Sequence, residues 1–292
     1  MNAPHRHHYI PRMILRNFLN DRRGLYFWRR GFPVGDIKST KPENLFVEDD
    51  LYTIVGDEGE RDVSVEHGFA KMETSGAHLI RQLVDIVRAG KKPRLEEATW
   101  EFLQHFRYFA DKRSSAWHSR FLSDDEFNAV MAEVASQPHW TDEDRAWMSD
   151  PKDVDRIKRN SRIAAQTSGP PDELLDEMRK RGLAIYVAPR NGAFILGDHP
   201  TAMARVGQAA KDAPGGKISF MPIASDMAIG YYTKARTVHV EQLTRAQLRT
   251  MNEAMVRQSV MIAGRSRELV SSLSKIPYET PDYFTTSDYL WG

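Results

Sequence analysis

Two long segments of the chain repeat their hydrophobic residues every three to four positions, which is the pattern of amphipathic helices. At about 100° per residue, one face of the segment 63–88 collects Val65, Phe69, Met72, Gly76, Ile80, Leu83 and Val87. The segment 95–121 carries a similar stripe of Phe102, Phe106, Phe109 and Trp117. The pattern therefore predicts two long helices that pack against each other.

Other hydrophobic residues come in short runs, rich in aromatic and β-branched side chains and bounded by glycine or proline, as in strands. Two such runs, 25–30 and 45–55, precede the long helices. Four more follow them at 183–189, 194–198, 217–223 and 227–233, with an Arg-Asn-Gly-Ala turn between the first two. A short helix beginning at Pro11 and a final helix pair from Thr244 to about Ser274 complete the chain. This order predicts an α+β fold, helix-dominated, with two long packed helices and a mainly antiparallel sheet.

The segment 123–170 differs from its surroundings because it is polar and interrupted by prolines. Ser123 and Glu126 have the spacing of a capping box, which marks the start of a helix. Short helices punctuated by prolines follow. We expect residues 1–292 to form a single elaborated domain, with 123–170 as a helical insertion within it.

Charge and composition narrow the classes of function. The 41 basic residues nearly cancel the 40 acidic ones, so binding of nucleic acid or another polyanion would have to be local. No apolar run approaches the roughly 20 residues of a membrane span. The start of the chain lacks the apolar region of a secretory signal, so we expect a cytoplasmic protein. Because cysteine is absent, histidine, aspartate and glutamate are the strong metal ligands that remain.

Three charged residues fall on or beside the apolar faces of the two long helices. Glu73 lies on the flank of the first stripe, and Glu66 lies two turns before it. Arg113 occupies the next position of the phenylalanine stripe. A buried guanidinium cannot lose its charge and needs an anion nearby. That anion is either Glu73, in a structural ion pair between the helices, or the phosphate or carboxylate of a bound ligand.

Two further polar groups stand at the ends of predicted elements. Asp198 and His199 follow a hydrophobic strand and precede Pro200, a place where a rigid scaffold can present chemistry; the alternative is a turn in which Asp198 bonds its own backbone. His7 and His8 precede the first helix, whose positive end favours neutral imidazole and attracts anions. We favour His8 as the site residue because it adjoins Tyr9, although both histidines could belong to an exposed tail.

Several short motifs resemble, in their order, a large and mostly bacterial family known as domain of unknown function 4238. These motifs are "HHYIPRMILRNFL", "NLFVEDDLY", "VEHGFAKMETSG", "FRYFADKR", "FILGDHP" and "FMPIASDMAIGY". The family begins with a His-Tyr-Ile-Pro type of motif. Its characteristic positions correspond here to His8, Tyr9, Pro11, Glu48, Tyr52, Glu66, Glu73, Arg113, Asp198, Pro200 and Pro222. The resemblance covers nearly the whole chain except 123–169. It implies that the polar residues form one constellation, but it brings no activity.

A set of histidine, glutamate, aspartate and arginine residues suits a divalent metal, Mg²⁺ or Mn²⁺, with an arginine clamp, as in phosphodiester hydrolysis. We therefore consider a metal-dependent phosphodiesterase or nuclease, with Glu73, Arg113 and Asp198 as catalytic residues. In that hypothesis His8, Glu73 and Asp198 hold the metal, and His8, Tyr9, Glu48 and Glu66 bind a small anionic ligand or nucleic acid. The alternatives are a non-catalytic binding protein for an anionic ligand or partner, and a structural Glu–Arg core.

Overall fold

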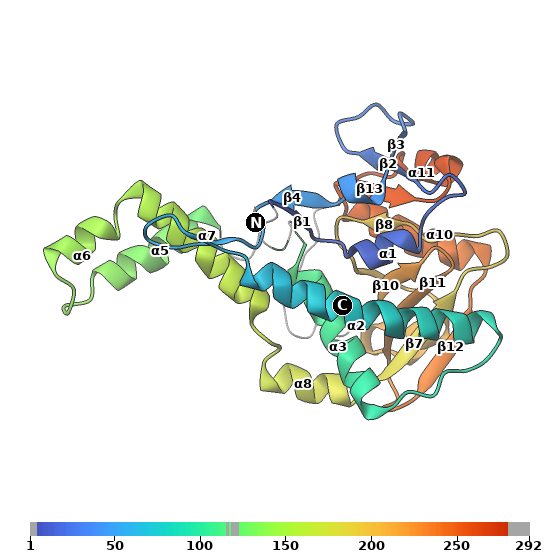
Figure 1. The fold of residues 1–292 in the computed structure, drawn as a ribbon. Helices are drawn as coiled ribbons and strands as arrows, with labels where there is room; N and C mark the ends of the chain where they lie inside the picture. Colours follow the sequence, from blue (N-terminus) through green and yellow to red (C-terminus); the bar gives the residue numbers. More distant parts are fainter. Residues whose placement is uncertain (1–4, 115–116, 118–122, 280–292) are drawn as a thin grey trace.

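The computed structural model describes residues 5–114, 117 and 123–279. Figure 1 shows a body of sheets and helices from which a helical arm extends to one side. Helix accounts for 45% and strand for 19% of the structure, and the sheets are mostly antiparallel. The protein is thus an α+β protein, as the order of the sequence patterns predicts, and helices outweigh strands.

The helices of the body include the two long ones that the hydrophobic periodicity predicts. The first, α2, matches its predicted bounds closely, whereas α3 ends where Arg113 caps it, short of the predicted end at 121. Residues 115–116 and 118–121 of that prediction lie outside the described residues. The helices and 3₁₀ turns of the body are α1 (Arg12–Arg16), η1 (Pro42–Asn44), α2 (Ser64–Arg88), α3 (Glu97–Lys112), α8 (Asp172–Arg179), α9 (Gly207–Asp212), η2 (Pro214–Gly216), α10 (Arg245–Arg257) and α11 (Arg267–Leu273).

The larger sheet has the strand order β12-β7-β11-β10-β9, in which β12 runs parallel to β7 and the other pairs are antiparallel. Its strands are β7 (Gly182–Val187), β9 (Ala202–Ala204), β10 (Ile218–Ala224), β11 (Met227–Tyr232) and β12 (Val238–Gln242). The register between β10 and β11 shifts at Pro222, which fits a proline inside a central strand because proline cannot donate a ladder hydrogen bond. Helix α3 packs on β7 and β11, and the Arg107 guanidinium lies 4.2 Å from the centre of the Tyr231 ring.

A second, antiparallel sheet has the order β3-β2-β13-β8. Its strands are β2 (Leu25–Arg29), β3 (Lys38–Thr40), β8 (Leu196–Gly197) and β13 (Met261–Gly264). The chain also forms two short strand pairs, β1 (Arg6–His8) with β4 (Val47–Asp49), and β5 (Ile54–Val55) with β6 (Arg61–Asp62).

Six strands of the described structure are absent from the sequence prediction, namely β1, β3, β6, β9, β12 and β13. β1 and β12 contain histidine and other polar residues, which hide their extended conformation. β13 has four residues and lies between α10 and α11, so the pattern there indicates only a helix pair. The Arg-Asn-Gly-Ala turn also does not join a hairpin, because β7 and β8 belong to different sheets.

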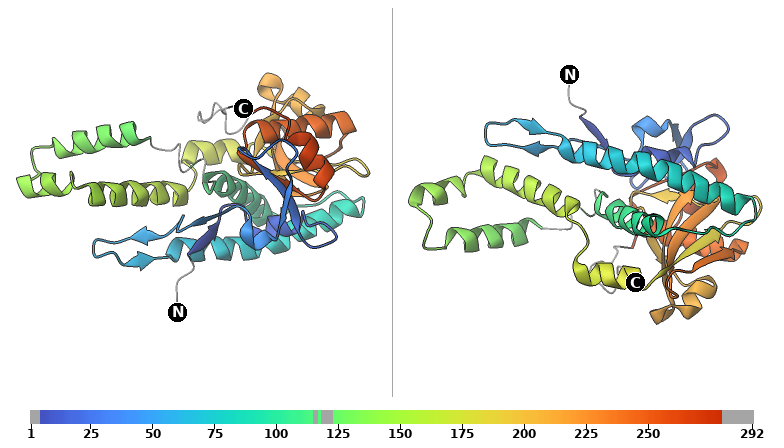
Figure 2. Two further views of the ribbon diagram at one scale, coloured as in Figure 1. Left: turned by 90° about the horizontal axis from the view of Figure 1, so that it is seen from above. Right: turned by 60° about the horizontal axis from the view of Figure 1, so that its bottom comes forward.

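The arm consists of α5 (Asp124–Ala135), α6 (Asp142–Trp147) and α7 (Pro151–Thr167). Ser123 and Glu126 form the predicted capping box of α5. Figure 2 shows the arm extending away from the sheets, with the β5–β6 pair along α7. The Asn160 side chain fastens this contact, because it bonds both the N–H and the carbonyl of Val55, at 3.1 and 2.7 Å.

Candidate functional site

The side chain of Arg113 is completely buried at the end of α3 and forms an ion pair with Glu73 of α2. Arg113 Nη2 lies 2.8 Å from Glu73 Oε1, and 0% of the arginine and 21% of the glutamate side chain is exposed. The positions of the two residues on their helices predicted this meeting. The structural alternative of the sequence analysis, an ion pair between the two helices, is therefore present.

Two other segments supply further partners of Arg113. Its Nη2 also donates to the carbonyl of His8 at 2.8 Å, and its Nε to the Tyr52 hydroxyl at 3.4 Å. The Tyr52 hydroxyl donates in turn to the Arg113 carbonyl at 2.9 Å, and the guanidinium lies 4.4 Å from the centre of the Phe69 ring. Burial alone would lower the pKa of Arg113, but Tyr52 and Glu73 outweigh it and raise that pKa above its ordinary value.

The two histidines of β1 lie in different surroundings. His7 is fully buried, accepts the Tyr52 N–H through Nδ1 at 3.0 Å, and stacks on the Tyr52 ring at 5.5 Å. The half-buried His8 imidazole donates to the Pro42 carbonyl at 3.1 Å, and burial lowers its pKa. Because side chains alternate along a strand, His8 cannot face the same side as His7. His8 contributes its carbonyl to the cluster, while its imidazole bonds Pro42 and also feels the charges of Glu73 and Arg113.

Glu66 completes the cluster of His7, Tyr52, Glu66, Glu73 and Arg113, which we call the Arg113 cluster. Burial raises the pKa of Glu66, and the neighbouring Arg113 and His7 only partly oppose this, while Glu73 adds to it. Its buried Oε2 atom has no hydrogen-bond partner among the described residues, and the same holds for Nη1 of Arg113. One donor and one carboxyl oxygen thus lie unused in the same cluster.

Two other predicted binding residues lie at the margin of this cluster. Tyr9 is a core residue, whose ring meets Phe46 edge-on at 5.8 Å and whose N–H donates to the Phe46 carbonyl at 3.1 Å. Glu48 pairs with His7 in the register of β1 and β4, and its side chain is largely exposed. Desolvation raises the pKa of Glu48 and Arg159 opposes this. Tyr9 therefore serves packing, and Glu48 neighbours the cluster through the backbone of β1.

Asp198 lies at a different place from the Arg113 cluster. Its carboxylate accepts the Val260 N–H at 3.0 and 3.2 Å, and its own N–H donates to the Met261 carbonyl at 3.0 Å. The pairing of β8 with β13 fixes this position, and the carboxylate is used to bond the backbone. Burial raises the pKa of Asp198 to about 6.

The predicted metal set of His8, Glu73 and Asp198 is consequently not assembled. Within the described ranges 5–114, 117 and 123–279, no group of three or more His, Asp or Glu side chains is placed to hold a metal ion. The physical reason is that sheet pairing directs Asp198 toward β13, while strand alternation turns the His8 imidazole to Pro42. Sequence reasoning also missed the buried role of His7; the alternation of β1 could have revealed it, had the strand been recognised.

Replacing Glu73 with glutamine should destabilise the protein by about 3 kcal/mol, because it removes the charge opposite a fully buried guanidinium. Equilibrium urea unfolding at neutral pH measures this loss. Glu66→Gln is the matched control on the same helix, and we expect it to be neutral or stabilising because burial disfavours the charged form of Glu66. Equal losses for both variants would contradict the assignment of Glu73 as the counter-charge.

The stability of the protein should depend on the ionisation of Asp198. Its folded pKa of about 6 exceeds the value of about 3.9 in an unfolded chain. The protonated form therefore contributes stability that is complete below the unfolded pKa and is lost as pH rises through the folded one, by about 3 kcal/mol. Urea unfolding from acidic to neutral pH should show this loss in the wild type and its absence in Asp198→Asn. Parallel pH profiles would contradict the raised pKa.

The described part of the chain contains no helix long and apolar enough to cross a membrane. No curated protein and no solved structure matches the chain. The profile of a family described as a protein of unknown function, DUF4238, matches residues 6–271 and so spans the Arg113 cluster, the arm and both larger sheets. The chain belongs to the DUF4238 family.

Proposed function

We propose that the Arg113 cluster binds a small ligand through a carboxylate or phosphate group. The observation that carries this proposal is the pair of buried atoms without partners, Arg113 Nη1 and Glu66 Oε2. An unsatisfied buried polar group costs about 1–3 kcal/mol. Two such atoms in one cluster are therefore best explained by a group that bonds both when it binds.

The chemistry of the two atoms specifies the ligand group. Nη1 of Arg113 can only donate. Burial raises the pKa of Glu66 and so extends the pH range of its protonated form, which also donates through the carboxyl proton. Each group then needs an acceptor oxygen, and a carboxylate or phosphate offers enough oxygens for both.

The charges of the cluster agree with such a ligand when Glu66 is protonated. The ion pair balances the charge of Arg113 with that of Glu73, so the anion meets no excess negative charge. Ionised Glu66 would repel the anion and would no longer donate. Binding is therefore expected to be tied to the uptake or retention of one proton on Glu66.

Calorimetric titration with sulfate and with acetate between about pH 5 and 8 tests the proposal. Wild-type affinity should fall about tenfold for each pH unit above the pKa of Glu66, because binding requires its proton. Glu66→Gln keeps a donor and carries no charge, so its affinity should not change with pH over the same range. Sulfate keeps a constant charge there and leaves Glu66 as the titrating partner.

The control is Glu66→Leu, which removes both the charge and the donor and should bind weakly at every pH. Identical pH profiles for the wild type and Glu66→Gln would contradict the role of Glu66. Absence of binding in both proteins would leave the Arg113–Glu73 pair with the structural role alone.

A second proposal adds phosphodiester hydrolysis at the same residues. The specific observation is that Glu73 lies near enough to Glu66 for its charge to contribute to the raised pKa of Glu66. Proteins commonly hold Mg²⁺ through one or two carboxylates while substrate phosphates complete the coordination. In this version Glu66 and Glu73 would hold the ion, and Nη1 of Arg113 would stabilise charge on the phosphoryl group.

If a divalent ion binds, Mn²⁺ at a hundred times its dissociation constant should stabilise the native protein by about 2.7 kcal/mol. Thermal unfolding with and without Mn²⁺ measures this shift, and Glu66→Gln should abolish it. Hydrolysis of bis(p-nitrophenyl) phosphate in the same samples tests catalysis. Acetate binding without any effect of Mn²⁺ would decide for the non-catalytic site.

A further inference from the structure

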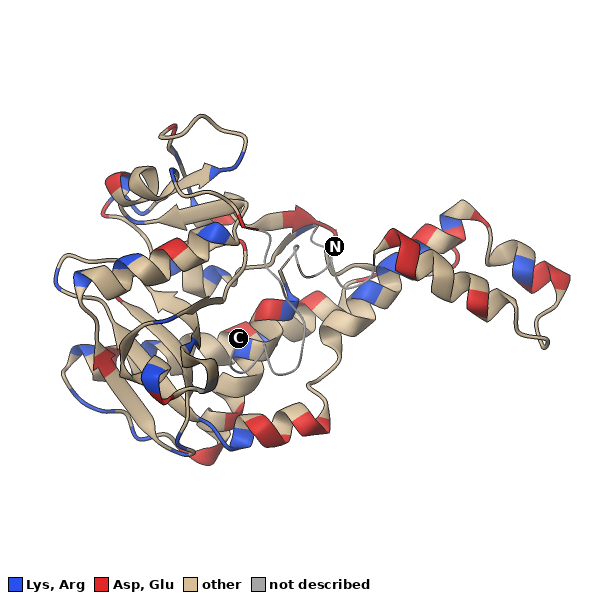
Figure 3. Ribbon diagram, turned by 180° about the vertical axis from the view of Figure 1, so that it is seen from behind, with Lys and Arg blue, Asp and Glu red and all other residues tan. Residues whose placement is uncertain are grey.

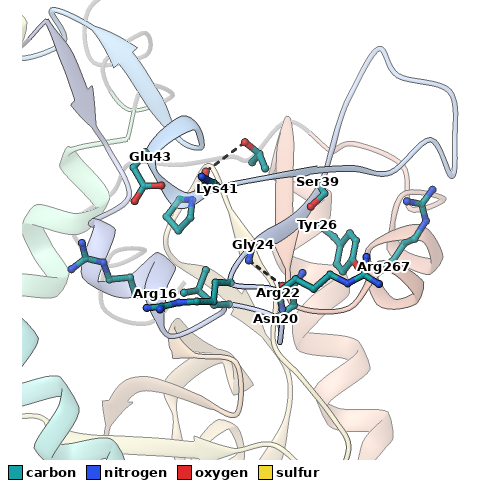
Figure 4. Close-up of a pocket in the computed structure, with 13 residues that line it drawn as sticks. Arg16, Asn20, Arg22, Gly24, Tyr26, Ser39, Lys41, Glu43 and Arg267 are labelled. Atoms are coloured by element: carbon teal, nitrogen blue, oxygen red, sulfur yellow. Dashed lines mark hydrogen bonds between the residues drawn. The ribbon is translucent and has the colours of Figure 1, made fainter.

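We infer that a basic groove beside η1 binds single-stranded nucleic acid. The groove encloses about 1350 Å³ and is formed by α1, the following loop, β2, the β3–η1 segment and the start of α11. Figure 4 shows Arg16 and Glu43 toward one side of it, and Tyr26 and Arg267 toward the other. Its lining residues are Arg16, Leu19, Asn20, Arg22, Arg23, Gly24, Tyr26, Ser39, Thr40, Lys41, Pro42, Glu43 and Arg267.

The charge of the groove is strongly one-sided. Five of its side chains are cationic, namely Arg16, Arg22, Arg23, Lys41 and Arg267. None of these side chains forms an ion pair or a side-chain hydrogen bond within the described part of the chain. The acidic lining residue, Glu43, is already paired with Arg12 at 2.9 Å. The groove thus carries an excess of positive charge in a protein whose total is near zero.

Local structure holds two of these arginines in a fixed loop. Asn20 Oδ1 accepts the N–H groups of Arg22 and Gly24, both at 3.0 Å. Arg23 adopts a left-handed backbone conformation, with φ of 59°. The Asn20 side chain therefore fixes the backbone of the loop that carries Arg22 and Arg23. The backbone that carries the two arginines is thus ordered before an anion binds, which lowers the entropy cost of binding.

The dimensions and the lining favour a nucleic acid strand over other anions. The volume of about 1350 Å³ exceeds the range of about 300–1,000 Å³ typical of small-molecule sites. A groove suits a chain better than the flat surface of a membrane. Half-buried Tyr26 lines it together with Arg22 and Arg267, so an aromatic ring lies among the cations, as in sites where bases stack and phosphates are neutralised. Stacking requires unpaired bases, which a duplex does not expose.

This inference does not depend on the proposed ligand of the Arg113 cluster. None of the five residues of that cluster lines the groove. The two sites meet at the η1 turn. Pro42 lines the groove, and its carbonyl accepts a hydrogen bond from the imidazole of His8. Failure of one proposal would leave the other unchanged.

Fluorescence anisotropy with labelled single-stranded RNA and DNA of about 16 nucleotides tests the inference. If all five cations contact phosphates, the logarithm of the affinity should fall with the logarithm of the salt concentration with a slope of about −3.5. A fourfold increase in salt should then weaken binding about a hundredfold. Comparison of the RNA with the DNA shows whether the 2′-hydroxyl contributes.

Matched substitutions separate the groove from the rest of the surface. Arg22→Glu and Arg267→Glu should each weaken binding about tenfold or more and reduce the salt slope by at least about 0.7. Lys152→Glu makes the same charge change on the arm, where Lys152 is exposed and basic and acidic residues are mixed (Figure 3), and should have little effect. Tyr26→Leu should weaken binding about tenfold without changing the salt slope, because stacking is not electrostatic.

Three results would overturn the inference. The first is absence of salt-dependent binding of either oligonucleotide. The second is an equal loss in Lys152→Glu and Arg22→Glu, which would place binding outside the groove. The third is equal affinity for heparin, duplex DNA and the single strands together with no effect of Tyr26→Leu, which would show a surface for any polyanion. Binding to anionic vesicles without binding to the oligonucleotides would favour a membrane instead.

Discussion

The buried guanidinium of Arg113 is the constraint on which the arrangement of the N-terminal half depends. Arginine stays protonated in proteins. The end of α3 can therefore be buried only if other segments provide hydrogen-bond and ion-pair partners for the guanidinium. Glu73 comes from α2, a carbonyl from His8 in β1, and a hydroxyl from Tyr52. One charge therefore ties three distant segments to the end of α3, and loss of any one of these partners leaves part of the guanidinium unsatisfied.

Close packing of three helices beside the ion pair supports this arrangement. Gly76 lies one turn after Glu73 on α2, and a Cβ at this position would meet Met13 Cε at 3.0 Å and Phe102 Cζ at 3.1 Å. The absence of a side chain lets α1 and α3 approach α2 on the same side. A larger residue would push apart the helices that carry Arg113 and Glu73, so the geometry of the charge pair depends on an uncharged residue.

The two carboxylates of α2 experience different environments although both lie near the same arginine. Glu73 bonds the guanidinium directly, at 2.8 Å. Glu66 feels Arg113 only through space, and the cost of its burial dominates. This difference between two acids is the kind of asymmetry that separates a proton donor from a fixed charge in binding and catalytic sites. It is also why the cluster is not explained fully as a salt-bridged core, since a purely structural role gives no reason to bury Glu66 Oε2 without a partner.

The sequence predicts best where a long periodic pattern fixes the face of each residue. α2 was predicted to within a residue of its bounds, and the meeting of Glu73 with Arg113 followed from their helical faces. Prediction failed where a position depends on strand pairing. His7 and His8 could not be assigned without knowing that β1 pairs with β4, and Asp198 could not be placed without the pairing of β8 with β13. Those pairings join residues about 40 to 65 positions apart, and no local pattern specifies them.

The positive charge of the basic groove could likewise not be predicted from the sequence. Arg16, Arg22 and Arg23 are near one another in the sequence, but Lys41 and Arg267 come from separate segments, and the overall balance of charge conceals all five. Strand β2 pairs with β3 on one side and with β13 on the other. Because β3 leads into Lys41 and β13 leads into the start of α11, this strand order brings both cations beside the loop before β2. The groove is therefore a product of sheet topology, and its charge becomes visible only when the order of the strands is known.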